Sequence, residues 1–426
     1  MRIARVLKAL ASRTSTNHTE RGFTLVELLV AIAAGSLVAT AAVLLSKNAV
    51  RLFQEESRIS YAQVAVANGL ARIGQDLEYA GRNTTKNPRT DPRVCYLGLA
   101  DWPIGMRRLA AVHIEPVAPV QQNAGNDIRN ERITIAGDIE SGDNWVMNST
   151  LPGAGGPTIV LQPRSRSIRR LSALTNGGNI AGRLADIFRT GRILHIEGPT
   201  NDYYGRISGF NVVGGIDIDN ISVQLEATPN VPMQPQSLLP CAIKGFGSGF
   251  PVHVISRVRY EVRSIINEPA FADFTQPVNI VTGDDTRLEL MRTELLPNDA
   301  DMPGTTELIT EFAIGMRFGL SALAVTSQPD NPTIERFPIL DPDPNAQIYA
   351  IAGAADDAGS RPEAIRSVQV RLSTRSRAPD RPTTLPGQPG KPYRYLVNTA
   401  RGADRFARVR TLEREFTLIN MKGGFR

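Results

Sequence analysis

Residues 23–45 form a predominantly apolar run that carries a single charge, the carboxylate of Glu27. As a helix, this run would extend about 35 Å at ~1.5 Å per residue, whereas the hydrocarbon core of a bilayer is roughly 30 Å thick. An acid inside such a run costs about 2.5–3.5 kcal/mol on membrane-insertion scales. The run therefore predicts a membrane-spanning helix in which Glu27 has a functional role.

The residues on either side of the run distinguish a membrane anchor from a secretory signal. Five basic residues and one acid precede it: Arg2, Arg5, Lys8, Arg13 and Arg21 against Glu20. Basic residues before an apolar span keep that end of the chain cytoplasmic. No Ala-x-Ala-like cleavage site follows residue 45, and apolar residues continue at helical spacing to residue 80 without a proline. The pattern predicts one long helix over residues 23–80, with residues 23–45 in the membrane.

The start of this helix, Gly22-Phe23-Thr24-Leu25-Val26-Glu27, resembles the processing site of type IV pilins and pseudopilins. The resemblance implies that a prepilin peptidase removes residues 1–22 by cutting after Gly22, and that Phe23 is then N-methylated. It also implies that Glu27 pairs with the α-amino group of a neighbouring subunit's Phe23 during filament assembly. The physics agrees, because a buried charge needs a partner and a new cationic N-terminus supplies one.

The charge balance argues against a nucleic-acid partner for the chain as a whole. The formal net charge is +6, and without the basic first 22 residues 43 basic and 41 acidic residues remain, a net charge of +2. A balance this close to neutrality gives no reason to expect nucleic-acid binding. One basic cluster predicts a solvated surface, with polyanion binding as the sharper alternative: Arg164, Arg166, Arg169 and Arg170.

The two cysteines, Cys95 and Cys241, both lie beyond the membrane run. An exported domain meets an oxidising compartment, so we expect a Cys95–Cys241 disulfide. The alternative is two separate buried thiols, since free cysteine behaves as a small hydrophobe.

Beyond Gly81, which can adopt the left-handed conformation that ends a helix, short alternating segments replace the helical period. The predicted strands are residues 132–136, 158–161, 192–197, 216–225, 251–264, 287–292, 312–320, 365–373 and 414–421. The proline-rich residues 327–344 and 378–392 predict exposed loops. The predicted fold class is α+β, with a long N-terminal helix packed on a C-terminal antiparallel β-sheet head that loops or an inserted lobe enlarge.

A second resemblance narrows the family. The end of the helix, residues 70–82, looks like that of PilW-type minor pilins, in which an acidic-hydrophobic step leads into an Ala-Gly pair. The strand order over residues 259–262, 288–292, 307–319, 365–376 and 414–420 is similar to the C-terminal sheet of PilW-type minor pilins and J-type minor pseudopilins. Residues 251–426 are thus predicted to be the β-sheet region of the head, and residues 81–250 a β-rich lobe that matches neither family.

Catalytic and ligand-binding patterns are weak, and we expect no enzyme activity, cofactor or metal. The chain has no HExxH, Cys-x-x-Cys, G-x-S-x-G or Walker-type motif. The histidines are scattered, at His18, His113, His195 and His253, and residues 245–249 predict a turn. Acidic positions that could attract a cation, with a solvated surface as the favoured reading, are Asp217, Asp219, Asp284, Asp285, Asp341 and Asp343.

The resemblance implies a minor pilin of a type IV pilus, which primes polymerisation and lies at the filament tip. Implied partners are other minor pilins, the major pilin, a prepilin peptidase, an inner-membrane assembly platform and a tip adhesin. The implied location is the bacterial inner membrane, with a cytoplasmic N-terminus and a periplasmic head, and then the pilus at the cell surface. Three alternatives stay open: a minor pseudopilin of type II secretion, a membrane-anchored periplasmic binding protein or enzyme, and a DNA-uptake pilin resting only on the arginine cluster.

Overall fold

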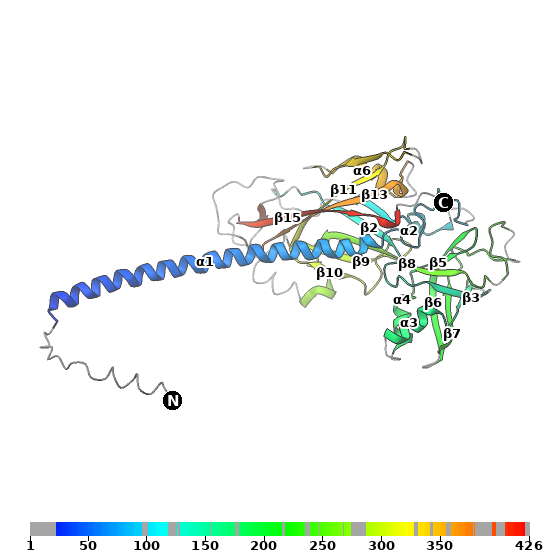
Figure 1. The fold of residues 1–426 in the computed structure, drawn as a ribbon, viewed down its shortest axis with the longest axis horizontal. Helices are drawn as coiled ribbons and strands as arrows, with labels where there is room; N and C mark the ends of the chain where they lie inside the picture. The colour runs from blue at the N-terminus through cyan, green and yellow to red at the C-terminus, as the bar shows by residue number, and fades with distance from the viewer. Residues whose placement is uncertain are drawn as a thin grey trace, which may run out of the picture. The chain divides into compact units, whose positions relative to one another are not determined.

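Figure 1 shows the computed structural model of the protein. It describes residues 23–95, 101–117, 126, 128–153, 155–174, 179–214, 218–234, 239–245, 247–266, 268–273, 287–327, 331–340, 344–354, 359–377, 379, 394–397 and 405–421. The chain divides into two compact units, one up to Ser57 and one from Arg58. We refer to the second unit as the head.

Helix α1, Leu25–Glu78, is 54 residues long, because no proline interrupts its hydrogen-bond ladder. Residues 23–58 are all exposed, and an apolar window in α1 is long enough to cross a membrane by length and composition. From Ala62 onward one side of the helix is buried, at three- and four-residue spacing. The chain leaves the helix through Gly81, which has a φ of +73°, so the predicted end of the helix is confirmed.

One antiparallel sheet of the head has five strands in the order β12-β11-β13-β15-β14. Their bounds are β11 Ala313–Leu323, β12 Ile334–Phe337, β13 Ile365–Arg375, β14 Arg394–Val397 and β15 Arg405–Thr417. The prediction for the last strand was wrong at both ends, since β15 begins nine residues earlier and a 3-10 turn, Ile419–Met421, follows it. The proline-rich segment predicted to be a loop contains β12, a short exposed strand at the sheet edge, where proline is tolerated.

The second sheet has ten strands, all antiparallel. Their bounds are β1 Val112–Pro116, β2 Glu131–Gly137, β3 Trp145–Leu151, β4 Thr158–Leu161, β5 Ile193–Glu197, β6 Asp202–Gly214, β7 Ile218–Leu225, β8 Pro251–Arg263, β9 Glu289–Glu294 and β10 Glu307–Thr310. Strand β8 belongs to two parts of this sheet. Its first half pairs with β3 and β5, and its second half pairs with β2 and β9.

Six of these strands close into a barrel, in the order β8-β3-β4-β7-β6-β5 and back to β8. Side chains fill its interior, as in other small barrels, and Trp145 packs edge-on against Phe188 with ring centroids 5.3 Å apart. Two amphipathic helices, α3 (Arg166–Leu174) and α4 (Ile180–Ile187), bury apolar side chains in the same core, and α4 contacts β6. The barrel strands from β3 to β7 lie within residues 81–250, which the sequence predicts as an additional lobe, but the barrel also needs β8. Strands β1 and β2 of the same range lie outside the barrel and pair with the second half of β8.

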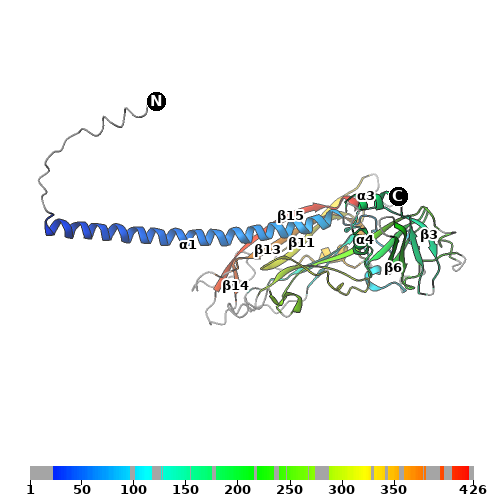
Figure 2. The ribbon, with the colours of Figure 1, turned by 90° about the horizontal axis from the view of Figure 1, so that it is seen from below.

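The C-terminal part of α1 packs into the other main core of the head, alongside β15 and β11 in both views (Figures 1 and 2). Val66, Leu70, Ile73 and Leu77 are buried among side chains of both sheets and of α6 (Ala346–Ala352). The approach is close because Gly74 has no Cβ, and a Cβ there would lie 2.4 Å from the ring of Phe416. The predicted packing of a long helix on an antiparallel β-sheet is confirmed.

Three short elements complete the described fold: α2 (Ile104–Arg107) and the 3-10 turns Pro269–Phe271 and Pro362–Ala364.

Candidate functional site

The predicted processing site lies at the start of α1. Gly22 is outside the described residues, and the side chain of Phe23 is 82% exposed. The amide and hydroxyl of Thr24 both donate hydrogen bonds of 3.0 Å to Glu27 Oε2, and the amide of Glu27 donates to Thr24 Oγ1 at 3.3 Å. This reciprocal arrangement is a capping box, which satisfies amides that the first helical turn leaves without partners.

The capping box gives the Glu27 carboxylate partners within its own chain. A carboxylate in the first turn is also stabilised by the positive end of the helix dipole. Thr24 was not singled out from the sequence, although a threonine three residues before a glutamate at a helix start is a recognisable signal. The acid in the apolar run, four residues after Phe23, is thus held in one orientation by Thr24. Phe23 is the residue at which a cut after Gly22 would create an amine.

The rest of the first unit presents apolar side chains to its surroundings. The exposed large hydrophobic residues between positions 25 and 53 are Leu25, Val26, Leu28, Leu29, Val30, Ile32, Leu37, Val38, Val43, Leu44, Leu45, Val50, Leu52 and Phe53. A continuous exposed apolar surface of this length marks a membrane or a protein contact. A helix that is apolar on all sides is suited to lipid and to a bundle of similar helices.

Comparison with protein families supports this interpretation of the helix start. The family model of the prokaryotic N-terminal methylation motif matches residues 17–43, which include Gly22, Phe23 and Glu27. Neither the curated proteins nor the solved structures compared with the chain include a match. With the helix-on-sheet fold, the motif supports a type IV pilin-like or pseudopilin protein anchored in a membrane by α1. The motif implies processing by a prepilin peptidase and assembly with other pilins.

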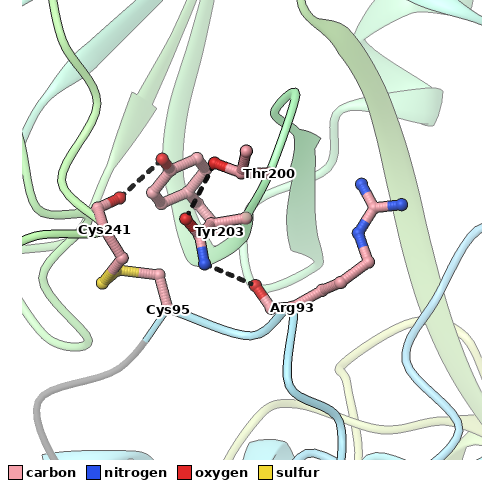
Figure 3. The surroundings of a disulfide bond; sticks show 6 residues. Arg93, Cys95, Thr200, Tyr203 and Cys241 are labelled. Atoms are coloured by element: carbon pink, nitrogen blue, oxygen red, sulfur yellow. Dashed lines mark hydrogen bonds between the residues drawn. A yellow bond between two sulfur atoms is a disulfide. The ribbon is translucent and has the colours of Figure 1, made fainter.

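Cys95 and Cys241 form a disulfide in the barrel, with their Cα atoms 5.7 Å apart (Figure 3). The hydroxyl of Tyr203 donates to the carbonyl of Cys241 at 2.7 Å, and the amide of Cys95 donates to the carbonyl of Asp202 at 2.9 Å. The bond therefore fastens the segment that follows α1 to the barrel.

A buried ion pair fixes the end of α1 to the second sheet. Asp76, only 2% exposed, accepts hydrogen bonds from Arg292 Nε at 2.8 Å and from Tyr260 Oη at 2.7 Å. Burial acts to lower the pKa of Arg292, but the charge of Asp76 outweighs it and raises that pKa. Burial and the same charge raise the pKa of Tyr260. Arg72 also pairs with Asp76, at an N···O distance of 3.1 Å. Arg72, Asp76 and Arg292 line a pocket of about 360 Å³. The hydrophobic periodicity of the sequence gave no signal for the Asp76–Arg292 pair, because the two residues are 216 positions apart.

The three described histidines are buried. His195 and His253 are opposite each other on β5 and β8, and both contact Asn83, His195 through Nδ1 at 2.6 Å and His253 through Nδ1 at 3.0 Å. The ring of His195 stacks on Tyr204 at 4.6 Å. Burial lowers the pKa of His113. His195 and His253 hold the segment after α1 against the barrel.

The remaining candidates are spread over the chain. Outside the described residues lie His18, Asp217, Asp284, Asp285, Asp341 and Asp343, and of Asp219 only the backbone in β7 is described. Gly245, Gly247 and Gly249 have φ values of 66°, 65° and 87°, as a turn requires. Within the described residues, no group of three His, Cys, Asp or Glu side chains could hold a metal ion.

Proposed function

We propose that the protein is a minor pilin of the PilW type, a subunit that other minor pilins join to start a type IV pilus. The observation that carries this proposal is the helix start, where Thr24 holds the Glu27 carboxylate four residues after Phe23, within the residues that the methylation-motif model matches. After a cut behind Gly22, Phe23 would bear a cation that a neighbouring Glu27 could neutralise.

Transfer of α1 from lipid into a filament explains why the N-terminal half of the helix exposes apolar side chains. The exposed apolar residues of this half need either lipid or other helices around them. In a filament, the helices of neighbouring subunits would supply that contact. A carboxylate without an opposite charge in an apolar bundle is strongly unfavourable, so a subunit in which Glu27 meets an amine is preferred over one in which Thr24 alone contacts it.

The size of the head supports a place at the tip. Every subunit along a filament shaft is surrounded by neighbours, whereas a subunit at the end has a free side. The barrel adds five strands, the first half of β8 and two helices to the helix-on-sheet unit, and space for such an addition is available at the end of a filament. In this proposal the protein assembles rather than catalyses, and its partners include the major pilin and the inner-membrane platform.

The processing step is tested by replacing Gly22. Gly22→Ser should leave residues 1–22 on the protein, because the residue before the cut is changed, and mass spectrometry of membrane fractions measures this. A processed chain of normal mass in this variant would refute the cleavage assignment.

The assembly step is tested at Glu27. Glu27→Ala should insert into the membrane normally but should be at least tenfold depleted from sheared filaments. Glu56→Gln, which removes an exposed carboxylate of the same helix beyond the membrane span, is the matched control and should be recovered normally. Equal recovery of both variants would contradict the pairing role.

A minor pseudopilin of type II secretion would share the same motif and helix. Recovery of the subunit with pilus filaments, and retained secretion in its absence, distinguishes the pilus assignment from this one.

A further inference from the structure

Helix α3 places arginines on one exposed side of the barrel. Ile168 and Leu171 are buried in the barrel core, and Ser165 caps the helix by accepting a hydrogen bond from the amide of Ile168. This register fixes which positions face the solvent. The exposed arginines of α3 and the residues just before it are Arg164, Arg166, Arg169 and Arg170, and Arg183 is exposed on α4.

The arrangement costs stability locally. Arg166 repels Arg169 and Arg170, three and four residues further on, by about 0.2–0.5 kcal/mol per pair. Cations in the first turn also oppose the helix dipole, by about 0.3–1 kcal/mol each. Within the described residues, Arg170 is the member of this group that pairs with an acid, Asp143 at 3.0 Å. Fold stability therefore does not explain why the arginines gather here.

The chemistry of the cluster matches phosphate. The planar guanidinium binds phosphate oxygens through two parallel hydrogen bonds. Arg166 to Arg170 lie within about 6 Å along the helix axis, and a DNA duplex carries one negative charge per ~1.7 Å of its axis. Three guanidiniums in this space can therefore contact several phosphates of one duplex.

Two features of the surface select the kind of polyanion. A helix that binds a bilayer inserts a broad apolar side, but Ile168 and Leu171 are already buried in the barrel, and Leu174 is the one large apolar side chain that α3 exposes. Proteins that bind single strands stack bases on exposed aromatic rings. Among the described residues the exposed large aromatic side chains are Phe23, Phe53 and Tyr61, and all lie outside the barrel. Both features favour a duplex, contacted through its backbone.

We propose that the arginine surface of α3, formed by Arg164, Arg166, Arg169 and Arg170, binds the phosphate backbone of double-stranded DNA without sequence preference. The near-neutral charge of the whole chain does not reveal this surface, because its charge is local. The proposal is independent of the assembly role of α1.

The test is the salt dependence of binding to a fluorescein-labelled 25-base-pair duplex, measured by anisotropy with the full chain in neutral detergent. Each phosphate contact contributes about −0.9 to the slope of log K against log salt. Arg166→Gln/Arg169→Gln should therefore make the slope less negative by about 1.8 and weaken binding at least tenfold at 50 mM salt. The basic leader contributes equally to all variants, so differences between variants isolate α3.

The matched control is Arg336→Gln/Arg410→Gln, which removes two exposed arginines from strands of the other sheet and should leave the slope unchanged. Circular dichroism melting verifies that both variants fold. An unchanged slope in the α3 variant, tighter binding to a single strand than to the duplex, or an α3-dependent binding to phosphatidylglycerol vesicles in place of DNA would each overturn the proposal.

Discussion

Asp76→Ala tests how α1 is held in the head. The substitution removes the carboxylate that accepts from Arg292 and Tyr260, both of which are buried. Loss of one partner of a buried ion pair costs about 3–5 kcal/mol, because the other charge stays buried. The carboxylate of Glu307, 3.2 Å from Arg292, still neutralises part of the arginine's charge. We therefore expect a loss of about 3 kcal/mol in the free energy of unfolding, at the lower end of this range.

Urea unfolding followed by circular dichroism, in neutral detergent, measures this loss. Glu78→Ala is the matched control, since Glu78 is an exposed acid two residues further along the same helix, and it should change the free energy of unfolding by less than about 0.5 kcal/mol. In the double variant Asp76→Ala/Arg292→Met, most of the lost stability should return, because no unpaired charge is left in the core. Equal unfolding midpoints for Asp76→Ala and Glu78→Ala would refute the reasoning.

Three further predictions concern the head. Gly137→Ala should destabilise by about 1–3 kcal/mol in the same urea assay, because a Cβ there would lie 2.2 Å from the backbone oxygen of Tyr79; an unchanged midpoint would contradict that contact. Cys95→Ser/Cys241→Ser should lower the free energy of unfolding by up to about 5 kcal/mol, because the disulfide joins residues 146 positions apart. Unfolding of the barrel followed by fluorescence measures this, and a curve that matches that of the oxidised protein would contradict a stabilising role of the disulfide. Burial raises the pKa of Glu289 to about 7, above its unfolded value, so its contribution to stability is present below pH ~4.5 and is lost as pH rises through 7. In the Glu289→Gln variant, the loss of stability between pH 5 and 8 should be smaller than in the unmodified protein. Melting temperatures of the two proteins that fall in parallel over this range would contradict the prediction.

The elements that depend on residues close together in the sequence, such as α1 and strand β8, could be predicted from the sequence. The apolar run, the absence of proline and the position of Gly81 were enough to predict α1 and its end. Alternation predicted strand β8, in which Val258, Tyr260 and Val262 lie on one face and are buried. On the opposite face of the same strand Arg257 is buried in an ion pair with Asp299, which alternation alone does not predict.

Barrel closure could not be predicted, because the pairing of β5 with β8 joins segments about 60 residues apart that look like any other alternating strands. Helix α3 was also missed, since its nine residues bury few apolar side chains and the run was recognised only by its charge. At the helix start, sequence found Glu27 but not the role of Thr24. The partner of a buried charge such as Asp76 is decided by tertiary structure and is invisible to any short window.

The dual pairing of β8 restricts how this head can change. Its first five residues complete the barrel, and the following residues are central in the neighbouring sheet. Insertion or loss of one residue in the middle of β8 would move the side chains of one half of the strand to the opposite face of the sheet, since side chains alternate between faces. Deleting residues 139–250 would leave the first half of β8 without partners and expose an unpaired edge. The barrel is therefore not a detachable insertion, and grafting it onto another pilin would require transplanting β8 in register with the recipient sheet.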